Sequence, residues 1–154
     1  GPCSYNPEPV ADFVDVFSIG EGEEAIPELV ELYRKCKKEG KTKKEFLYLA
    51  ATTLEGFYVP SLYDVEYNED GTIRSFTPAQ GVPAKIQKRI IKDLDKVYYP
   101  TKSEIPYIET VHDRIVMEIF RGCIRGCRFC QAGMIYRPNR EKDVEVLKEY
   151  ARKM

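Results

Sequence analysis

The sequence lacks several features that would place it in a common class of protein. No apolar run approaches the roughly 18 residues that a membrane-spanning helix needs, so no transmembrane segment is predicted. The formal net charge is -1, without the basic excess that normally marks a nucleic-acid surface. Neither a membrane nor a nucleic acid is therefore indicated as a partner.

Histidine and paired cysteines, the usual ligands of structural zinc, are also scarce. The chain has one histidine, His112, and five cysteines, three of them in a single cluster, which is not the pattern of a disulfide framework. Structural zinc sites usually take four ligands in two separated pairs. Only Cys3, Cys36 and His112 could complete such a set, and none has a zinc-like spacing. We expect the cytoplasm as the location, because an oxidising compartment would consume the clustered thiols.

The clustered cysteines are the most informative feature of the chain. Cys123, Cys127 and Cys130 are separated by three and then two residues, with glycines interleaved. Three thiolates on one such loop can reach a single inorganic centre together. Iron–sulfur clusters normally take four cysteine ligands, so a local set of three leaves one iron open. An open coordination position is where a metal centre does chemistry.

The N-terminal third predicts a strand followed by two helices. Residues 14–19 read as a buried strand and residues 23–38 as an amphipathic helix. Thr42 and Glu45 form a capping-box pattern that opens a second helix, which ends at Gly56. The apolar face of the first helix would comprise Ile26, Leu29, Val30, Tyr33 and Cys36. Cys36 is therefore interpreted as a core thiol.

The Gly20–Glu23 loop between this strand and helix has two interpretations. It is either a tight strand-to-helix turn or a contact for a nucleotide-like ligand, since such loops lie at the carboxyl end of a sheet. Its glutamates argue against a phosphate-binding role.

The middle of the chain predicts a β-hairpin within a linker. Residues 63–67 alternate in polarity, residues 68–71 form a turn signal, and residues 72–76 read as the returning strand. Many aromatic residues surround this hairpin, and they indicate docking on a neighbouring domain rather than a free linker.

The C-terminal part predicts a strand, the cysteine loop and then a helix. The strand would span residues 115–120 and the helix residues 141–152, with Val144, Leu147 and Tyr150 or Ala151 facing inward. This order is expected of the first βα unit of a barrel, with the cysteines at the catalytic face. His112 is either a polar residue at the start of the strand or a residue with a supporting or catalytic role near the cysteine site.

The cysteine spacing, with an aromatic residue just before the third cysteine, resembles the signature of the radical S-adenosylmethionine (SAM) superfamily. The resemblance implies a 4Fe–4S cluster ligated by Cys123, Cys127 and Cys130, with SAM on the remaining iron and Phe129 near its adenine. It also implies that the reduced cluster cleaves SAM to a 5′-deoxyadenosyl radical. Catalytic residues and substrate stay unknown.

Residues 1–9, 17–24 and 111–140 resemble more closely one branch of this superfamily, in which a cobalamin-binding-type Rossmann domain precedes the barrel. The implied fold class is α/β. Its parts would be the C-terminal portion of a Rossmann-like domain (1–56), a linker with the hairpin (57–112), and the first βα unit of a radical SAM (β/α) barrel (113–154).

This resemblance leaves two points open. A complete barrel takes about 250 residues, so we expect the chain to be a fragment spanning the domain junction. Domains that ligate cobalamin through histidine carry an Asp-x-His-x-x-Gly motif, which is absent. Either the half that bears it is missing, or this branch holds cobalamin without that ligand, or it holds none.

Two functions follow as hypotheses. The first is a radical SAM enzyme that binds the cluster and SAM and receives electrons from a donor such as flavodoxin or ferredoxin. The second is a non-catalytic interaction module in which the cysteines hold zinc or a cluster structurally.

Overall fold

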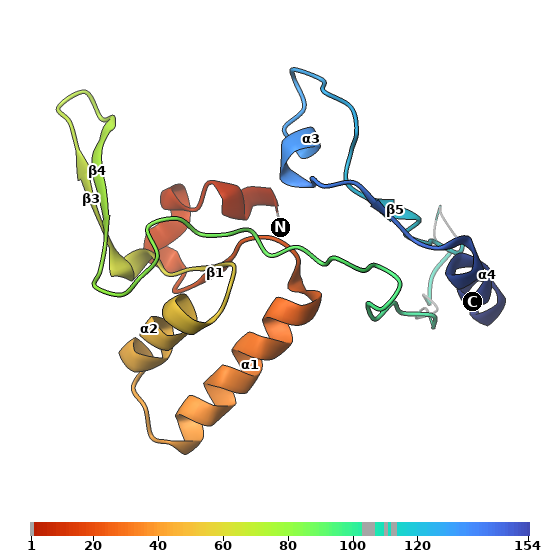
Figure 1. Ribbon diagram of the computed structural model, residues 1–154, viewed down its shortest axis with the longest axis horizontal. Helices are drawn as coiled ribbons and strands as arrows, with labels where there is room; N and C mark the ends of the chain where they lie inside the picture. Colours follow the sequence, from red (N-terminus) through yellow and green to blue (C-terminus); the bar gives the residue numbers. More distant parts are fainter. Residues whose placement is uncertain (1, 103–106, 110, 112–113) are drawn as a thin grey trace. The chain divides into compact units, whose positions relative to one another are not determined.

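A computed structural model describes residues 2–102, 107–109, 111 and 114–154. The chain forms two compact units, Gly1–Ile90 and Ile91–Met154. The fold is mixed α/β, and its described strands make three separate two-stranded antiparallel sheets (Figure 1). None of the helices in the described ranges combines the length and hydropathy needed to span a membrane.

The first unit carries most of the regular structure. Its elements in chain order are η1 (Pro2–Tyr5), η2 (Glu8–Phe13), β1 (Phe17–Ser18), α1 (Gly22–Lys38), α2 (Lys43–Thr53), β2 (Phe57–Tyr58), η3 (Pro60–Leu62), β3 (Tyr63–Tyr67) and β4 (Ile73–Pro78).

The two predicted helices are confirmed as α1 and α2. Glutamates occupy the first turn of α1 and lysines its last turn, which complements the helix dipole. The predicted capping box is present: the Thr42 side chain accepts a hydrogen bond from the Glu45 amide, and the Glu45 carboxylate accepts one from the Thr42 amide at 2.8 Å. This box fixes where α2 begins.

The predicted apolar face of α1 is only partly covered. Cys36 is 2% exposed, which confirms it as a core thiol, and Ala25 is fully buried. Ile26, Val30 and Tyr33 are each at least 40% exposed. The helix therefore buries a narrower stripe than its sequence pattern predicts.

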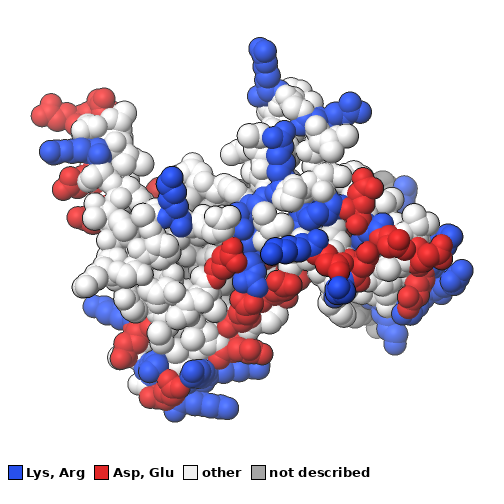
Figure 2. All heavy atoms as spheres, viewed as in Figure 1, with Lys and Arg blue, Asp and Glu red and all other residues white. Residues whose placement is uncertain are grey.

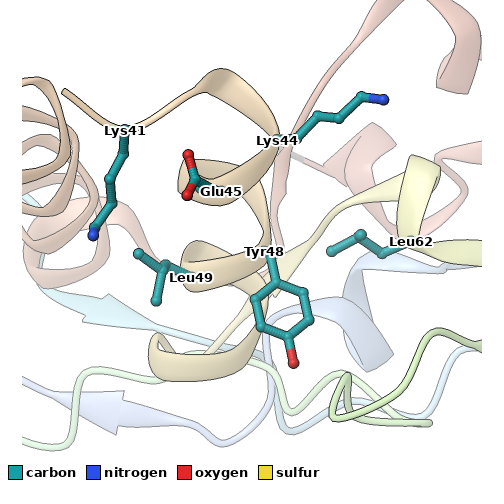
Figure 3. A pocket seen from close by; sticks show the side chains of 6 residues that line it. All are labelled: Lys41, Lys44, Glu45, Tyr48, Leu49 and Leu62. Carbon is teal, nitrogen blue, oxygen red and sulfur yellow. The ribbon is translucent and has the colours of Figure 1, made fainter.

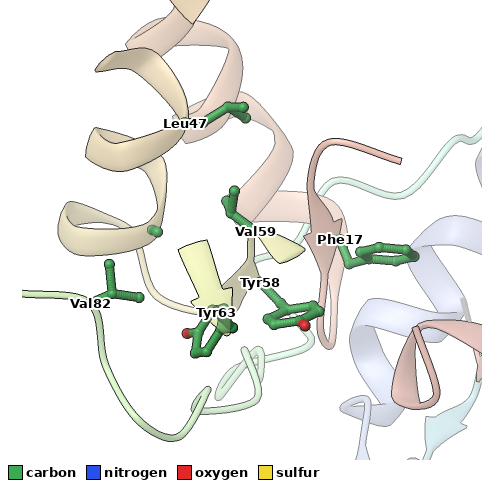
Figure 4. Packing of buried hydrophobic residues seen from close by; sticks show 7 residues of the cluster. Phe17, Leu47, Tyr58, Val59, Tyr63 and Val82 are labelled. Atoms are coloured by element: carbon green, nitrogen blue, oxygen red, sulfur yellow. The ribbon is translucent and has the colours of Figure 1, made fainter. Parts of the chain in front are cut away.

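The hydrophobic core of the first unit gathers side chains from α2, β1, β2 and the segment that follows β2. Its buried members are Phe17, Leu47, Ala51, Tyr58, Val59, Tyr63 and Val82 (Figure 4). Tyr58 and Tyr63 lie with ring centroids 4.9 Å apart, and Tyr63 stacks on Phe76 at 4.8 Å. The aromatic-rich middle segment thus packs against α2 and β1, as its composition predicts.

The strand predicted over residues 14–19 is shorter than expected. Only Phe17–Ser18 is a strand, and it pairs antiparallel with β2, with Phe17 opposite Tyr58. In the described ranges there is no Rossmann-type parallel sheet. Because β1 pairs antiparallel with β2, these residues form a small two-stranded sheet and not a parallel sheet linked by crossovers.

The predicted β-hairpin is confirmed. β3 and β4 pair antiparallel with Val65 opposite Phe76, and Figure 1 shows them as one extended ribbon. The turn closes through the Asn68 amide, which donates to the Thr72 carbonyl at 2.8 Å. Gly71 adopts φ 81°, the left-handed conformation that this turn needs.

The second unit has little regular structure. Its elements are β5 (Phe120–Arg121), α3 (Ala132–Ile135), β6 (Arg140–Glu141) and α4 (Val144–Lys153). The strand predicted over residues 115–120 and the helix predicted from residue 141 are therefore wrong in extent. β5 and β6 form a small antiparallel sheet, and the described residues form no barrel.

Helix α4 begins later than predicted because Asp143 caps it. The Asp143 carboxylate accepts a hydrogen bond from the Glu145 amide at 2.8 Å. Val144, expected to face inward, is 61% exposed. Tyr150 does pack inward, and its ring stacks on that of Tyr99 at 5.4 Å.

Candidate functional site

The cysteine loop, residues 122–139, is closed at its base by the β5–β6 pair. Arg121 lies opposite Arg140 in this pair. Gly122 follows with φ 113°, and a Cβ there would lie 2.7 Å from the Pro138 carbonyl oxygen. Only glycine lets the two ends of the loop approach so closely.

Buried polar contacts hold this base in place. Lys142, 5% exposed, donates from Nζ to the Leu94 carbonyl and lies over the rings of Tyr99 and Tyr150. The Tyr99 hydroxyl donates to the Val116 carbonyl at 3.0 Å. Sequence reasoning missed this anchor, since a lysine among surface-type residues gives no signal of burial.

The Arg121 side chain also stabilises the approach to the loop. Its Nε and Nη2 atoms each lie 2.9 Å from an oxygen of Glu118, in a two-point ion pair. Such forked pairs fix side-chain orientation better than a single contact does. The geometry thus assigns Arg121 to the base of the loop.

The three predicted ligands all lie on this loop as free thiols. Cys127 is exposed, and Cys123 and Cys130 are half-buried. The Cys130 amide donates to the Cys127 carbonyl at 3.1 Å, which folds the second half of the motif into a turn. Cys127 and Cys130 line one pocket of about 390 Å³, which Cys123 does not line.

The three sulfurs are not gathered at one point. Across the part of the chain that the structure describes, no group of three or more His, Cys, Asp or Glu side chains is placed to hold a metal ion. The donor chemistry nevertheless fits an iron–sulfur cluster, because three free thiols on one accessible loop are the ligands that such clusters take. Loading would require the loop to tighten around the centre.

The charge of the loop favours an anionic occupant. Residues 122–139 contain three arginines and no aspartate or glutamate. Figure 2 shows several blue side chains standing out from the segment that carries α3. Arg125, Arg128 and Arg137 line the pocket together with Phe129 and Met134. A thiolate-bound cluster and a carboxylate are both negatively charged, and these positive guanidinium groups would offset that charge.

Phe129 presents an open ring. Its side chain is 92% exposed, and it lies between Arg128 and Cys130 on the wall of the pocket. An exposed aromatic face beside a pocket is suited to stack on a flat heterocycle.

The Gly20–Glu23 loop, considered above as a ligand contact, is covered by the chain itself. The Arg89 amide donates to the Ile19 carbonyl at 2.9 Å, and the Glu21 amide donates to the Arg89 carbonyl at 3.1 Å. The Arg89 guanidinium pairs with Glu28 at 2.6 Å and with Glu24 at 3.1 Å. These carboxylates, Glu28 first, raise the pKa of Arg89. The structure favours the turn interpretation.

His112 lies outside the described residues, so its two interpretations stay predictions.

Comparison with known proteins gives one family match and one relative. Residues 1–60 match the family model described as "Radical SAM proteins, N-terminal". The uncharacterized protein MJ0966 of Methanocaldococcus jannaschii is 30% identical over 148 residues, which cover 96% of this chain and 26% of that protein. The chain thus spans about a quarter of the length of this relative. No solved structure matches.

The family match lies on the first unit, whereas the cysteine loop lies on the second. The match and the cysteine loop are separate observations on different residues. Residues 1–60 are therefore similar to the N-terminal region of radical SAM proteins.

Proposed function

We propose that this chain is the part of a radical SAM enzyme that holds its iron–sulfur cluster. Cys123, Cys127 and Cys130 would ligate a 4Fe–4S cluster, and SAM would occupy the iron that lacks a protein ligand. The observation that carries the proposal is the presence of three free thiols on one accessible loop, in a chain whose first 60 residues match the radical SAM N-terminal region.

When bound, the cluster supplies the electron that cleaves SAM to a 5′-deoxyadenosyl radical. The residues of the chain supply binding and orientation. The three thiolates hold the cluster, and the open face of Phe129 packs on the adenine. Arg125 and Arg128, which are exposed beside the thiols, offset negative charge on the cluster or on the SAM carboxylate.

Other parts of the proposal concern the whole protein. An external donor such as flavodoxin or ferredoxin would deliver the electron, in the cytoplasm, where thiols stay reduced.

The one histidine, His112, does not stand in a cobalamin-ligating motif. The residues present do not fit a histidine-ligated cobalamin, and no step is assigned to it.

The test is anaerobic reconstitution of the chain with iron and sulfide, followed by electron paramagnetic resonance of the reduced sample. We expect about four irons per chain and a spectrum that SAM perturbs. Stoichiometric zinc without iron would instead support a non-catalytic module with a structural metal. A cluster whose spectrum ignores SAM would contradict the SAM assignment while leaving the three ligands in place.

A further inference from the structure

The corner where α1 meets α2 carries a dense positive charge. Seven exposed basic side chains occur between residues 34 and 44, with Glu39 as the one acidic residue of that segment. These side chains form what we term the cationic corner: Arg34, Lys35, Lys37, Lys38, Lys41, Lys43 and Lys44. The net charge of the whole chain, -1, conceals this cluster.

Helix electrostatics do not account for the whole of this charge. Lysines in the last turn of α1 complement its dipole, but Lys43 and Lys44 occupy the first turn of α2, where positive charge is unfavourable. Lys43 is offset by Asp15 at 2.7 Å, and Lys41 by Glu39 at 3.0 Å. Among the described residues no ion pair engages the other five, Arg34, Lys35, Lys37, Lys38 and Lys44.

Two hollows open at this corner, and Lys41 lines both. The first, about 470 Å³, has Lys41 and Lys44 at its edge and Tyr48 in its wall. Figure 3 shows the two lysines on opposite sides of Glu45, with the Tyr48 ring beyond them. The second, about 370 Å³, is lined by Lys37 and Tyr33 among other residues.

The two tyrosines are held in place and yet remain open to solvent. The Tyr48 hydroxyl donates to the Gln80 carbonyl at 3.1 Å, and its side chain is 41% exposed. Tyr33 packs edge-to-face on Phe46, with centroids 5.3 Å apart, and is 49% exposed. Each hollow therefore offers a fixed aromatic ring beside lysines.

The acidic groups of the hollows are already engaged. The Glu45 carboxylate accepts hydrogen bonds from the Thr42 amide and hydroxyl, at 2.8 and 2.7 Å. Asp15 is paired with Lys43. The charge left to attract a ligand is therefore positive.

We infer that the cationic corner binds single-stranded nucleic acid. Lysine ammonium groups would contact successive phosphates, and unpaired bases would stack on Tyr33 and Tyr48, which is how sequence-tolerant single-strand sites work. A duplex keeps its bases stacked inside and cannot use these rings. The inference does not depend on the cysteine loop or on a bound cluster.

The test is fluorescence anisotropy of the full chain with labelled oligouridine and oligothymidine at several salt concentrations. Both ligands should bind, with a slope of log affinity against log salt of about -0.7 per phosphate contacted. The variant Lys41→Gln/Lys44→Gln should lose about tenfold in affinity and show a slope shallower by about 1.4, for two lost contacts. A preference for one sugar identifies the natural ligand as RNA or DNA, and either preference supports the inference.

A matched control changes the same charge elsewhere on the first unit. Arg74 and Lys85 are exposed and outside the corner, so Arg74→Gln/Lys85→Gln should leave affinity and slope unchanged. Equal losses in both double variants would overturn the site, because the effect would then follow net charge alone.

Stacking is tested separately from charge. Tyr33→Leu keeps apolar bulk against Phe46 but removes the ring, and it should weaken oligouridine binding about tenfold while leaving heparin binding unchanged. Circular dichroism confirms that the variant is folded. If Tyr33→Leu has no effect, or if duplex DNA binds as tightly as the single strands, the single-strand assignment is overturned.

Discussion

The ammonium group of Lys142 lies 5.7 Å from the centre of the Tyr99 ring, in the interior of the second unit. Its Nζ also donates to the Leu94 carbonyl, and the side chain is almost wholly buried. A buried charge is costly unless it is paired or hydrogen-bonded, so these contacts are what make Lys142 tolerable there. They tie residues 94–99 to the strand that closes the cysteine loop.

Replacing this lysine should therefore loosen the base of the loop. Lys142→Met keeps the apolar stem but removes the cation and its hydrogen bond, and it should cost about 2 kcal/mol. Denaturant unfolding measures the loss. The control is Lys148→Met, since Lys148 makes an exposed pair with Glu145 at 2.7 Å that contributes at most about 0.5 kcal/mol. Equal effects in the two variants would show that the Lys142 contacts contribute nothing special.

Tyr58 provides a prediction at alkaline pH. Burial, followed by the hydrogen bond that its hydroxyl donates to Glu8, raises the pKa of Tyr58 above the ordinary value of 10.0. The folded protein then holds this proton more tightly than the unfolded chain does. The stabilisation is fully present below pH 10 and is lost as the pH rises from there toward the raised pKa.

The variant Tyr58→Phe should lower stability by about 1 kcal/mol near neutral pH and should make the decline above pH 10 shallower. Unfolding free energies measured from pH 7 to 11 test this. Tyr67→Phe is the control, because Tyr67 is 55% exposed. An unchanged alkaline slope in Tyr58→Phe would show that other groups govern the decline; Tyr63, whose pKa burial also raises, is the first candidate.

Gly20 and Gly40 both adopt a positive φ, but only Gly20 lies against another part of the backbone, so the two sites separate conformational strain from steric clash. At Gly20, φ is 119° and a Cβ would lie 2.2 Å from the Arg89 carbonyl oxygen. At Gly40, φ is 69° and nothing lies within 4 Å of the corresponding position. Gly20→Ala should cost more than about 3 kcal/mol, and Gly40→Ala only about 1 kcal/mol. Similar unfolding midpoints for the two variants would mean that Arg89 does not pack on Gly20.

The capping box of α2 can be tested by mutation and by titration. Thr42→Ala removes the acceptor for the Glu45 amide and should cost about 1 kcal/mol. Hydrogen bonds from Thr42 hold the pKa of Glu45 below its ordinary value of 4.5, so the variant should show a higher Glu45 pKa by NMR. The stabilisation from this carboxylate is present above pH 4.5 and is lost as the pH falls through the lowered pKa. An unmoved Glu45 titration would mean that the box is not formed in solution.

The cluster proposal predicts a clear division among the cysteines. Cys123→Ala, Cys127→Ala and Cys130→Ala should each abolish iron and sulfide retention after reconstitution, because each removes one thiolate ligand. Cys36→Ala should retain full iron, since that thiol is buried in α1. Iron counts decide the matter. Full iron in the Cys127→Ala variant would remove Cys127 from the ligand set.

Local patterns predicted much of the first unit. The capping box at Thr42 and the turn signal at residues 68–71 are short-range devices, whose hydrogen bonds join residues three or four apart. Such signals carry their own geometry in the sequence. That is why α2 and the β3–β4 hairpin were placed correctly.

Contacts between distant residues were beyond reach of the same reasoning. The apolar run at residues 115–120 has the composition of a strand, but only its last residue belongs to β5, because the two-residue strand β6 is its one pairing partner among the residues that the structure describes. The contact of Arg89 with Glu28, 61 residues away, has no local signature. For the cysteine loop, spacing identified the three thiols, but not that only two of them line one pocket.

Arg89 packs on the β1–α1 turn. This contact shows that the part of the chain able to fold by itself is longer than the part that matches the family. The family match ends at residue 60, yet Tyr63 and Val82 complete the core that the matched residues begin. A polypeptide ending at residue 60 would expose that core and would leave Glu24 and Glu28 without their guanidinium partner. The smallest piece able to fold by itself should therefore extend to about Ile90, some thirty residues past the end of the family match.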